Sequence, residues 1–157
     1  MKHIAVRVPA GIDRGQRLRV AGKGHCGLKG GADGCLYLLV SILPQDVFTR
    51  NGLDVITRVS IDPVTAVLGG KARAATPYEL IDIDVPAGTC SGKKLTLAGK
   101  GLKSSTKTGS LTVELSIDPY VKLTAAQRKL LEEFKKTLSD SNFPKRGEYE
   151  HAAKNVI

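Results

Sequence analysis

Three residues of this chain, His25, Cys26 and Cys35, carry side chains that could bind a metal ion from one loop. A structural zinc ion needs about four ligands, usually in closely spaced pairs such as Cys-x-x-Cys. The sequence contains no Cys-x-x-Cys, and its remaining cysteine, Cys90, lies far along the chain. We therefore interpret these residues as loop side chains and predict neither a metal site nor a cofactor.

Two Gly-Lys-Gly segments, at residues 22–24 and 99–101, are the nearest approach to a phosphate-binding loop. A P-loop has the spacing Gly-x-x-x-x-Gly-Lys-Ser/Thr and opens a helix. Both segments lack that spacing and follow short strand patterns, so their glycines are interpreted as turn residues. No Ser/His/Asp or Cys/His combination stands out as a nucleophile with its base. The sequence therefore predicts no catalytic residues and no enzyme.

The composition is that of a globular protein with many turns. Of 157 residues, 41% are apolar and 25% charged, whereas only 4% are aromatic and 17 are glycine. No apolar run approaches the ~20 residues of a membrane span, and the N-terminus lacks the apolar segment of a secretory signal. Three cysteines, an odd number, do not suggest a disulfide framework. We expect a cytoplasmic protein without a membrane partner.

An internal repeat organises the sequence. Val-Pro-Ala-Gly at residues 8–11 recurs at 85–88, and the block at 15–24 recurs at 92–101, both with an offset of 77. A third block, at 34–44, recurs at 109–119 with an offset of 75. Three blocks in the same order predict a duplicated β unit.

Alternation of apolar and polar residues places the strands of each copy. Strands are predicted at residues 4–8 and 81–85, at 18–20 and 95–97, and at 36–42 and 111–117. Residues 36–40 are apolar on both faces, which predicts that both faces of that strand are covered. Before its 81–85 strand the second copy has a strand at 54–61, a helical turn at 63–68 and a strand near 71–75, which the first copy lacks.

The pattern changes near the C-terminus. Thr124-Ala-Ala-Gln127 has the form of a capping box. Four apolar residues then follow at helical spacing: Leu130, Leu131, Phe134 and Leu138. We predict one amphipathic helix whose apolar face packs either on its own sheet or against a second copy, followed by a polar, loosely ordered tail.

The repeated blocks resemble the C-terminal region of DnaJ-type J-protein co-chaperones. The resemblance rests on residues 6–24 and 30–37, on Val-Phe-Thr-Arg-Asn-Gly-Leu-Asp at 47–54, and on the shorter segments 66–70, 99–102 and 123–128. It implies two stacked, small β-sandwich or barrel-like subdomains, the first truncated, and a C-terminal dimerisation helix. The corresponding ranges are 1–46, 47–120 and 121–139, with a flexible tail at 140–157.

The resemblance also implies a function, namely binding of unfolded polypeptides and cooperation with a seventy-kilodalton heat-shock chaperone. The His-Pro-Asp motif of a J-domain, the Gly/Phe-rich linker and the cysteine repeats of the zinc module are absent from this sequence. Phe48 matches an aromatic residue that helps wall the client groove, although a phenylalanine in a β domain is often simply core. Weaker candidates for client binding are Tyr37, Leu39 and Ile42. The resemblance favours homodimerisation through the helix face.

The charge distribution keeps a second function open. The formal net charge is +9, of which residues 1–50 contribute +5 (8 basic and 3 acidic residues). The densest group is Arg14, Arg17, Arg19, Lys23 and Lys29. Such a basic patch predicts weak DNA binding as the alternative function, or a site for the acidic tail of the partner chaperone, or a solvated surface.

Overall fold

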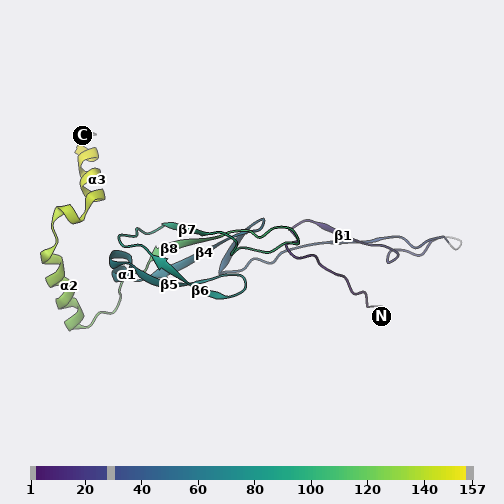
Figure 1. Cartoon of the computed structure of the whole chain (residues 1–157), viewed down its shortest axis with the longest axis horizontal. Coiled ribbons are helices and arrows are strands. Elements are labelled where there is room, and N and C mark those ends of the chain that lie inside the picture. Colours follow the sequence, from purple (N-terminus) through teal and green to yellow (C-terminus); the bar gives the residue numbers. More distant parts are fainter. Residues whose placement is uncertain (1–2, 28–30, 155–157) are drawn as a thin grey trace. The chain divides into compact units, whose positions relative to one another are not determined.

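The computed structural model describes residues 3–27 and 31–154, which belong to two units. Residues 1–119 form a unit built mainly from strands, and residues 120–157 form a helical unit (Figure 1). The predicted class, mainly β with a C-terminal helix, is confirmed. No helix among the described residues has the length and apolar character needed to cross a membrane.

The second copy of the repeat contains two sheets. The larger has the strand order β3-β4-β8-β7, formed by Phe48–Asn51, Asp54–Ile61, Leu111–Ile117 and Lys94–Leu97. In it β4 and β8 run parallel, and the other neighbours are antiparallel. The smaller sheet pairs β5 (Gly70–Ala75) with β6 (Leu80–Val85), and helix α1 (Pro63–Leu68) connects β4 to β5. The predicted strands at 54–61 and 111–117 and the helical turn at 63–68 are thus confirmed.

The hydrophobic core lies entirely within this second copy. Every other residue of β8 faces inward, and Leu111, Val113 and Leu115 are completely buried. The remaining buried apolar side chains come from β4, α1, β5 and β6: Val55, Ile61, Ala66, Ala74, Ile83 and Val85. The interior is therefore aliphatic, as expected from the low aromatic content.

The first copy is a hairpin with the same register. Strands β1 (Arg17–Val20) and β2 (Leu36–Leu39) pair Arg17 with Leu39, just as β7 and β8 pair Lys94 with Glu114. The backbone also matches at the turns, because Gly11 and Gly88 both have a positive φ, of 78° and 70°. Such values favour glycine. The duplication inferred from the sequence is thus present in the strand pairing and the turns.

Residues 4–8 form no strand, contrary to the prediction. Their counterpart β6 is held by hydrogen bonds to β5, whereas no strand among residues 3–27 and 31–154 pairs with residues 4–8. A strand needs a neighbour to pair its backbone N–H and C=O groups. The alternating pattern is present in residues 4–8, but the described chain offers them no strand to pair with.

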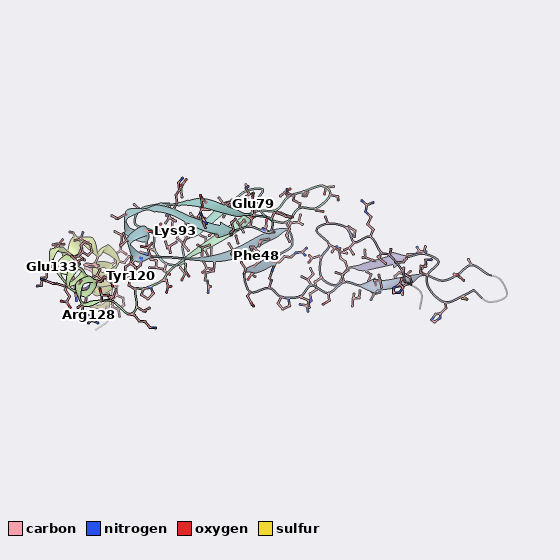
Figure 2. All side chains as sticks on the ribbon, turned by 90° about the horizontal axis from the view of Figure 1, so that it is seen from below. Phe48, Glu79, Lys93, Tyr120, Arg128 and Glu133 are labelled. Atoms are coloured by element: carbon pink, nitrogen blue, oxygen red, sulfur yellow. The ribbon has the colours of Figure 1, made fainter. Side chains whose placement is uncertain are left out.

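The predicted strand at 36–42 is also shorter, because β2 ends at Leu39. The expectation that both of its faces are covered is wrong, since Tyr37 is 61% and Leu39 70% exposed. Within residues 3–27 and 31–50 no residue is buried. Figure 2 shows the hairpin side chains projecting on both sides of its ribbon.

The helical unit begins with α2 (Ala125–Thr137), whose predicted capping box is confirmed. The Thr124 hydroxyl accepts a hydrogen bond from the Gln127 N–H, and the Gln127 side chain accepts one from the Thr124 N–H at 2.9 Å. The tail is more regular than predicted, because a short 3-10 turn (Asp140–Asn142) and helix α3 (Pro144–Lys154) follow. An ion pair between Arg146 and Glu150 at 2.9 Å, one helical turn apart, supports α3.

Candidate binding surfaces

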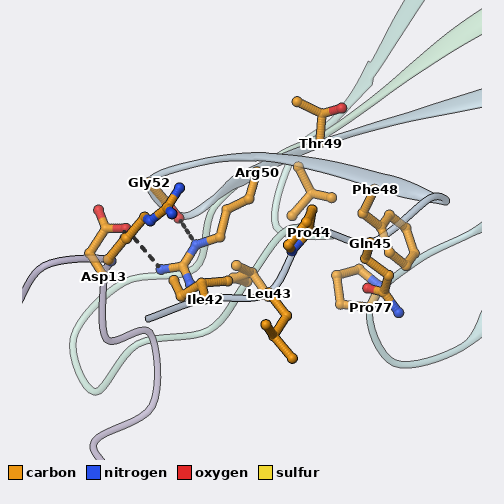
Figure 3. Close-up of a pocket in the computed structure, with 13 residues that line it drawn as sticks. Asp13, Ile42, Leu43, Pro44, Gln45, Phe48, Thr49, Arg50, Gly52 and Pro77 are labelled. Atoms are coloured by element: carbon orange, nitrogen blue, oxygen red, sulfur yellow. Dashed lines mark hydrogen bonds and ion pairs between the residues drawn. The ribbon is translucent and has the colours of Figure 1, made fainter. Parts of the chain in front are cut away.

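An open cavity of about 730 Å³ lies in the β unit, where the chain leaving β2 approaches β3 (Figure 3). Apolar side chains dominate its wall, and the charged ones gather around Arg50. The residues that line it are Asp13, Arg14, Ile42, Leu43, Pro44, Gln45, Phe48, Thr49, Arg50, Gly52, Val55, Pro77 and Leu102. The cavity is therefore suited to apolar side chains rather than to a charged small molecule.

Phe48 and Ile42, two of the predicted client-binding residues, both line this cavity. Phe48 is half-buried, and its side chain both packs against the core and lines the cavity. Ile42 is also half-buried, whereas Leu43 beside it is 84% exposed. An exposed leucine and a half-buried phenylalanine on the wall of one open cavity are typical of an apolar surface that marks an interaction site.

Arg50 fixes this site by joining the two copies of the repeat. Its guanidinium donates hydrogen bonds to the carbonyl oxygens of Gly11 (3.1 Å) and Ile12 (2.8 Å) in the first copy, and to that of Gly52 (2.7 Å) in its own hairpin. Asp13 forms an ion pair with it at 3.8 Å (Figure 3). The sequence did not predict a role for Arg50, because an arginine next to a hairpin turn is usually solvated. No feature of the neighbouring sequence indicates that its guanidinium binds main-chain carbonyls of the first copy.

Tyr37 and Leu39, the other two predicted client-binding residues, do not line the cavity. They lie on the exposed face of β2, directly opposite Arg19 and Arg17 of β1. Residues directly opposite each other in an antiparallel pair share a face of the sheet. Two of the predicted basic residues and two of the predicted client-binding residues thus form one surface, here called the hairpin face (Arg17, Arg19, Tyr37 and Leu39).

The other predicted basic residues lie elsewhere. Arg14 lines the cavity, and Lys23 is exposed after β1. Lys29 falls outside the described residues. Among the described basic residues, Arg17 and Arg19 share one face of β1, and the larger basic patch stays a prediction.

The possible metal ligands are not brought together. Across residues 3–27 and 31–154 no group of three or more His, Cys, Asp or Glu side chains is placed to hold a metal ion. The Cys35 sulfur instead accepts a hydrogen bond from the Arg19 guanidinium at 3.1 Å. A fixed positive charge beside a sulfur opposes binding of a second cation there.

The Gly-Lys-Gly segments lie at turns, as predicted. Gly22 and Gly99 both have positive φ, of 66° and 71°. Lys100 forms an ion pair with Glu79 at 2.9 Å, and its hydrogen bond and positive charge lower the pKa of the Glu79 carboxyl. The neighbouring Lys103 donates its N–H to the Tyr78 hydroxyl, and its ammonium lies 5.1 Å from the centre of the Tyr78 ring.

The α2 helix presents an uncovered apolar face in its own unit. Leu130 is 66%, Leu131 39% and Phe134 56% exposed, and Leu138 at the helix end is half-buried. No side chain of α2 is buried. In Figure 2 the labelled Arg128 and Glu133 mark this helix.

The fold and these surfaces define a class of protein: a duplicated β protein that offers uncovered apolar surfaces, with an amphipathic helix at its C-terminal end. Comparison with known families agrees. The sequence profile of the DnaJ C terminal domain matches residues 1–119, and the chain belongs to this family.

Individual relatives are similar over nearly the whole chain. The proteins named "Chaperone protein DnaJ" from Brucella canis, Brucella suis and Brucella abortus are each 40% identical to it over 147 residues. This alignment covers 92% of the present chain but 39% of each relative. The chain thus spans about two fifths of the length of the relatives it matches.

Proposed function

We propose that this chain is the polypeptide-binding part of a co-chaperone, which holds exposed apolar segments of unfolded proteins for a seventy-kilodalton heat-shock ATPase chaperone. The observation that carries the proposal is the open cavity that Phe48, Ile42 and the exposed Leu43 line. The names of the relatives, chaperone proteins, support it.

The cavity suits an unfolded segment for physical reasons. Its wall is mostly aliphatic and aromatic, so binding removes apolar surface from water without demanding a particular sequence. Arg50 holds the surrounding loops by hydrogen bonds to main-chain carbonyls, so the walls are formed before a client arrives. A preformed site loses little conformational entropy on binding.

Self-association through α2 is the second part of the proposal. An apolar helix face that no side chain of its own unit covers is stabilised when a second copy covers it, and a symmetric homodimer is the commonest solution. Two weak client sites on one dimer would also bind a long unfolded chain with higher avidity than either site alone.

The basic residues of the hairpin face support an alternative function, binding of DNA or of an acidic tail on the partner chaperone. Arg17 and Arg19 are both exposed on the same face of β1. Their direct neighbours, Tyr37 and Leu39, are exposed and apolar, which suits a polypeptide better than a phosphate backbone. DNA binding predicts an affinity that falls steeply with salt concentration.

Suppression of aggregation tests the proposal. A chemically denatured model protein is diluted into buffer with the full chain, and light scattering is followed with the unaltered chain and with Phe48→Ala. We expect the unaltered chain to suppress scattering and the variant to lose most of this effect. Suppression that Phe48→Ala leaves unchanged in a folded protein, checked by circular dichroism, would contradict the proposed site.

A further inference from the structure

The turn that connects β5 to β6 contributes to the wall of the cavity. It comprises residues 76–79, and its Pro77 is half-buried and lines the cavity together with Phe48 (Figure 3). Leu102, from the segment between β7 and β8, is half-buried and lines the cavity as well. Two segments that are far apart in the sequence therefore have to keep their relative position for the cavity to keep its shape.

The turn is closed by its own hydrogen bonds, which all involve Thr76. The Thr76 N–H and hydroxyl both donate to the Glu79 carbonyl oxygen, each at 2.8 Å. The Thr76 hydroxyl oxygen also accepts from the N–H groups of Tyr78 (3.2 Å) and Glu79 (2.9 Å). A proline at the second position favours such a turn, because its ring fixes φ. The turn is thus closed without help from the rest of the chain, and its outside contacts determine where it lies.

Two side chains of the turn bind the segment that carries Leu102. The Tyr78 hydroxyl accepts a hydrogen bond from the Lys103 N–H at 2.9 Å, and the Lys103 ammonium lies 5.1 Å from the centre of the Tyr78 ring. The Glu79 carboxylate accepts a hydrogen bond from the Lys100 ammonium at 2.9 Å. The turn and this segment are thus joined by a hydrogen bond, a cation–π contact and an ion pair.

These contacts lie directly beside the cavity residues. Pro77 immediately precedes the two side chains of the turn, and Leu102 lies between the two lysines in the sequence. The contacting side chains are themselves exposed, and exposed ion pairs contribute little to the stability of a whole fold. They can nevertheless fix a turn, because the only cost they have to offset is the conformational freedom of that turn. The contacts therefore favour a role in placing the cavity wall over a role in stabilising the fold.

We propose that Tyr78 and Glu79 are positioning residues for the polypeptide site, which hold Pro77 and Leu102 in place as two parts of the cavity wall. This inference rests on the function proposed for the cavity. Neither positioning residue is among the described residues that line the cavity, so both act through their neighbours. A binding-competent state that is populated only part of the time lowers the apparent affinity in proportion. Release of the turn therefore weakens client binding.

The first experiment measures the affinity of the full chain for a labelled, permanently unfolded protein by fluorescence anisotropy. Glu79→Lys places two ammonium groups side by side and should lower the affinity about threefold to fivefold. The charge swap, Glu79→Lys with Lys100→Glu, should restore the affinity. The matched control is Glu150→Lys, because Glu150 forms an ion pair of the same length, 2.9 Å, in α3 and its side chain is 56% exposed, against 57% for Glu79. The control should leave the affinity unchanged.

The second experiment measures amide hydrogen exchange of the free chain, which does not depend on the client. Tyr78→Phe keeps the ring but removes the hydroxyl that accepts from the Lys103 N–H, so this amide should exchange faster. The Leu102 amide, which donates to the Leu53 carbonyl at 2.8 Å, should keep its exchange rate. The affinity of Tyr78→Phe for the unfolded protein should fall about twofold, and its melting temperature should change little.

The outcomes separate this inference from the function on which it rests. If the unaltered chain binds no unfolded protein, the function proposed for the cavity is wrong and the inference falls with it. If the chain binds, and Glu79→Lys and Tyr78→Phe bind equally well, the inference alone is wrong. It is also overturned by a loss of affinity that the charge swap does not restore, as direct contact between Glu79 and the client predicts, or by one that accompanies a lower melting temperature.

Discussion

Arg50, in the second copy of the repeat, donates a hydrogen bond of 2.8 Å to the carbonyl oxygen of Ile12 in the first copy. The first copy has no buried residue among those described. Its own packing therefore stabilises it little, and the hydrogen bonds from Arg50 to Gly11 and Ile12 fix it to the second copy. A side chain on one copy thus shapes the cavity that both copies line.

Replacing Arg50 should loosen the first copy without unfolding the second. Arg50→Ala removes the charge-assisted hydrogen bonds to the Gly11 and Ile12 carbonyls, a change we put at about 2 kcal/mol, which corresponds to a roughly 30-fold larger population of the locally open state. Amide hydrogen exchange should accelerate at residues 11–16 and remain unchanged in β4 and β8. Arg50→Lys should accelerate it by a smaller amount, because one ammonium cannot reproduce the planar fork of the guanidinium. Equal amide exchange rates at residues 11–16 in all three proteins would show that the Arg50 hydrogen bonds do not stabilise the first copy.

The apolar face of α2 should control both oligomeric state and helix content. A helix of 13 residues without buried side chains is marginal by itself. We therefore expect helicity, measured by circular dichroism, to rise with protein concentration. Leu130→Asp with Phe134→Asp should give a monomer by analytical ultracentrifugation, whereas Lys129→Ala should not. A monomeric mass for the unaltered chain at micromolar concentration would refute the dimer.

The capping box should stabilise the first turn of α2. Thr124→Ala removes the hydroxyl that accepts from the Gln127 N–H and should cost about 1 kcal/mol of helix stability. Cα chemical shifts of residues 125–128 should move toward random-coil values. Thr124→Ser keeps the acceptor and should leave these shifts nearly unchanged; identical spectra for the alanine and serine variants would argue against the cap.

The ion pair between Glu79 and Lys100 should be visible in a pH titration. Because the folded pKa of Glu79 is lowered, its contribution to stability is present above the pKa of the unfolded chain and is lost as the pH falls through the folded pKa. NMR titration should place the midpoint of Glu79 below that of an ordinary glutamate. In Lys100→Gln the titration midpoint of Glu79 should rise toward that of an ordinary glutamate. An unchanged midpoint would show that Lys100 does not lower the pKa of Glu79.

The repeat explains how much of the fold was predictable. Strands β4 and β8 and helix α1 were predicted with their observed ends, because their patterns are local and their neighbours are present in the chain. Residues 4–8 have an equally clear pattern but form no strand, since no strand of the described residues lies beside them. Alternation of apolar and polar residues indicates which face of a sheet each residue would occupy, but a strand forms only when a second strand is present to pair with it.

The candidate site was predictable only in part. Of the four residues predicted to bind clients, Phe48 and Ile42 line one cavity, whereas Tyr37 and Leu39 lie on the hairpin face; client binding by any of them stays a prediction. Arg50 was missed because its partners are carbonyl oxygens nearly forty residues away in sequence. Helix α3 was not predicted, because its residues are mostly polar and show no apolar stripe. The clearest sequence signal for it is the pair Arg146 and Glu150, whose opposite charges are spaced one helical turn apart.

The central claim is that unfolded polypeptide binds at the cavity that Phe48 and Leu43 line, and direct binding tests it. The measurement is the fluorescence anisotropy of a labelled, permanently unfolded protein titrated with the full chain, at low and at high salt. Leu43 is 84% exposed, so that Leu43→Ser should not affect folding. Its matched control is Leu68→Ser, an exposed leucine on α1 outside the cavity.

We expect binding by the unaltered chain and by Leu68→Ser that changes little with salt, and an affinity several-fold lower for Leu43→Ser. Equal affinities for the two serine variants, or binding that disappears at high salt, would contradict the account.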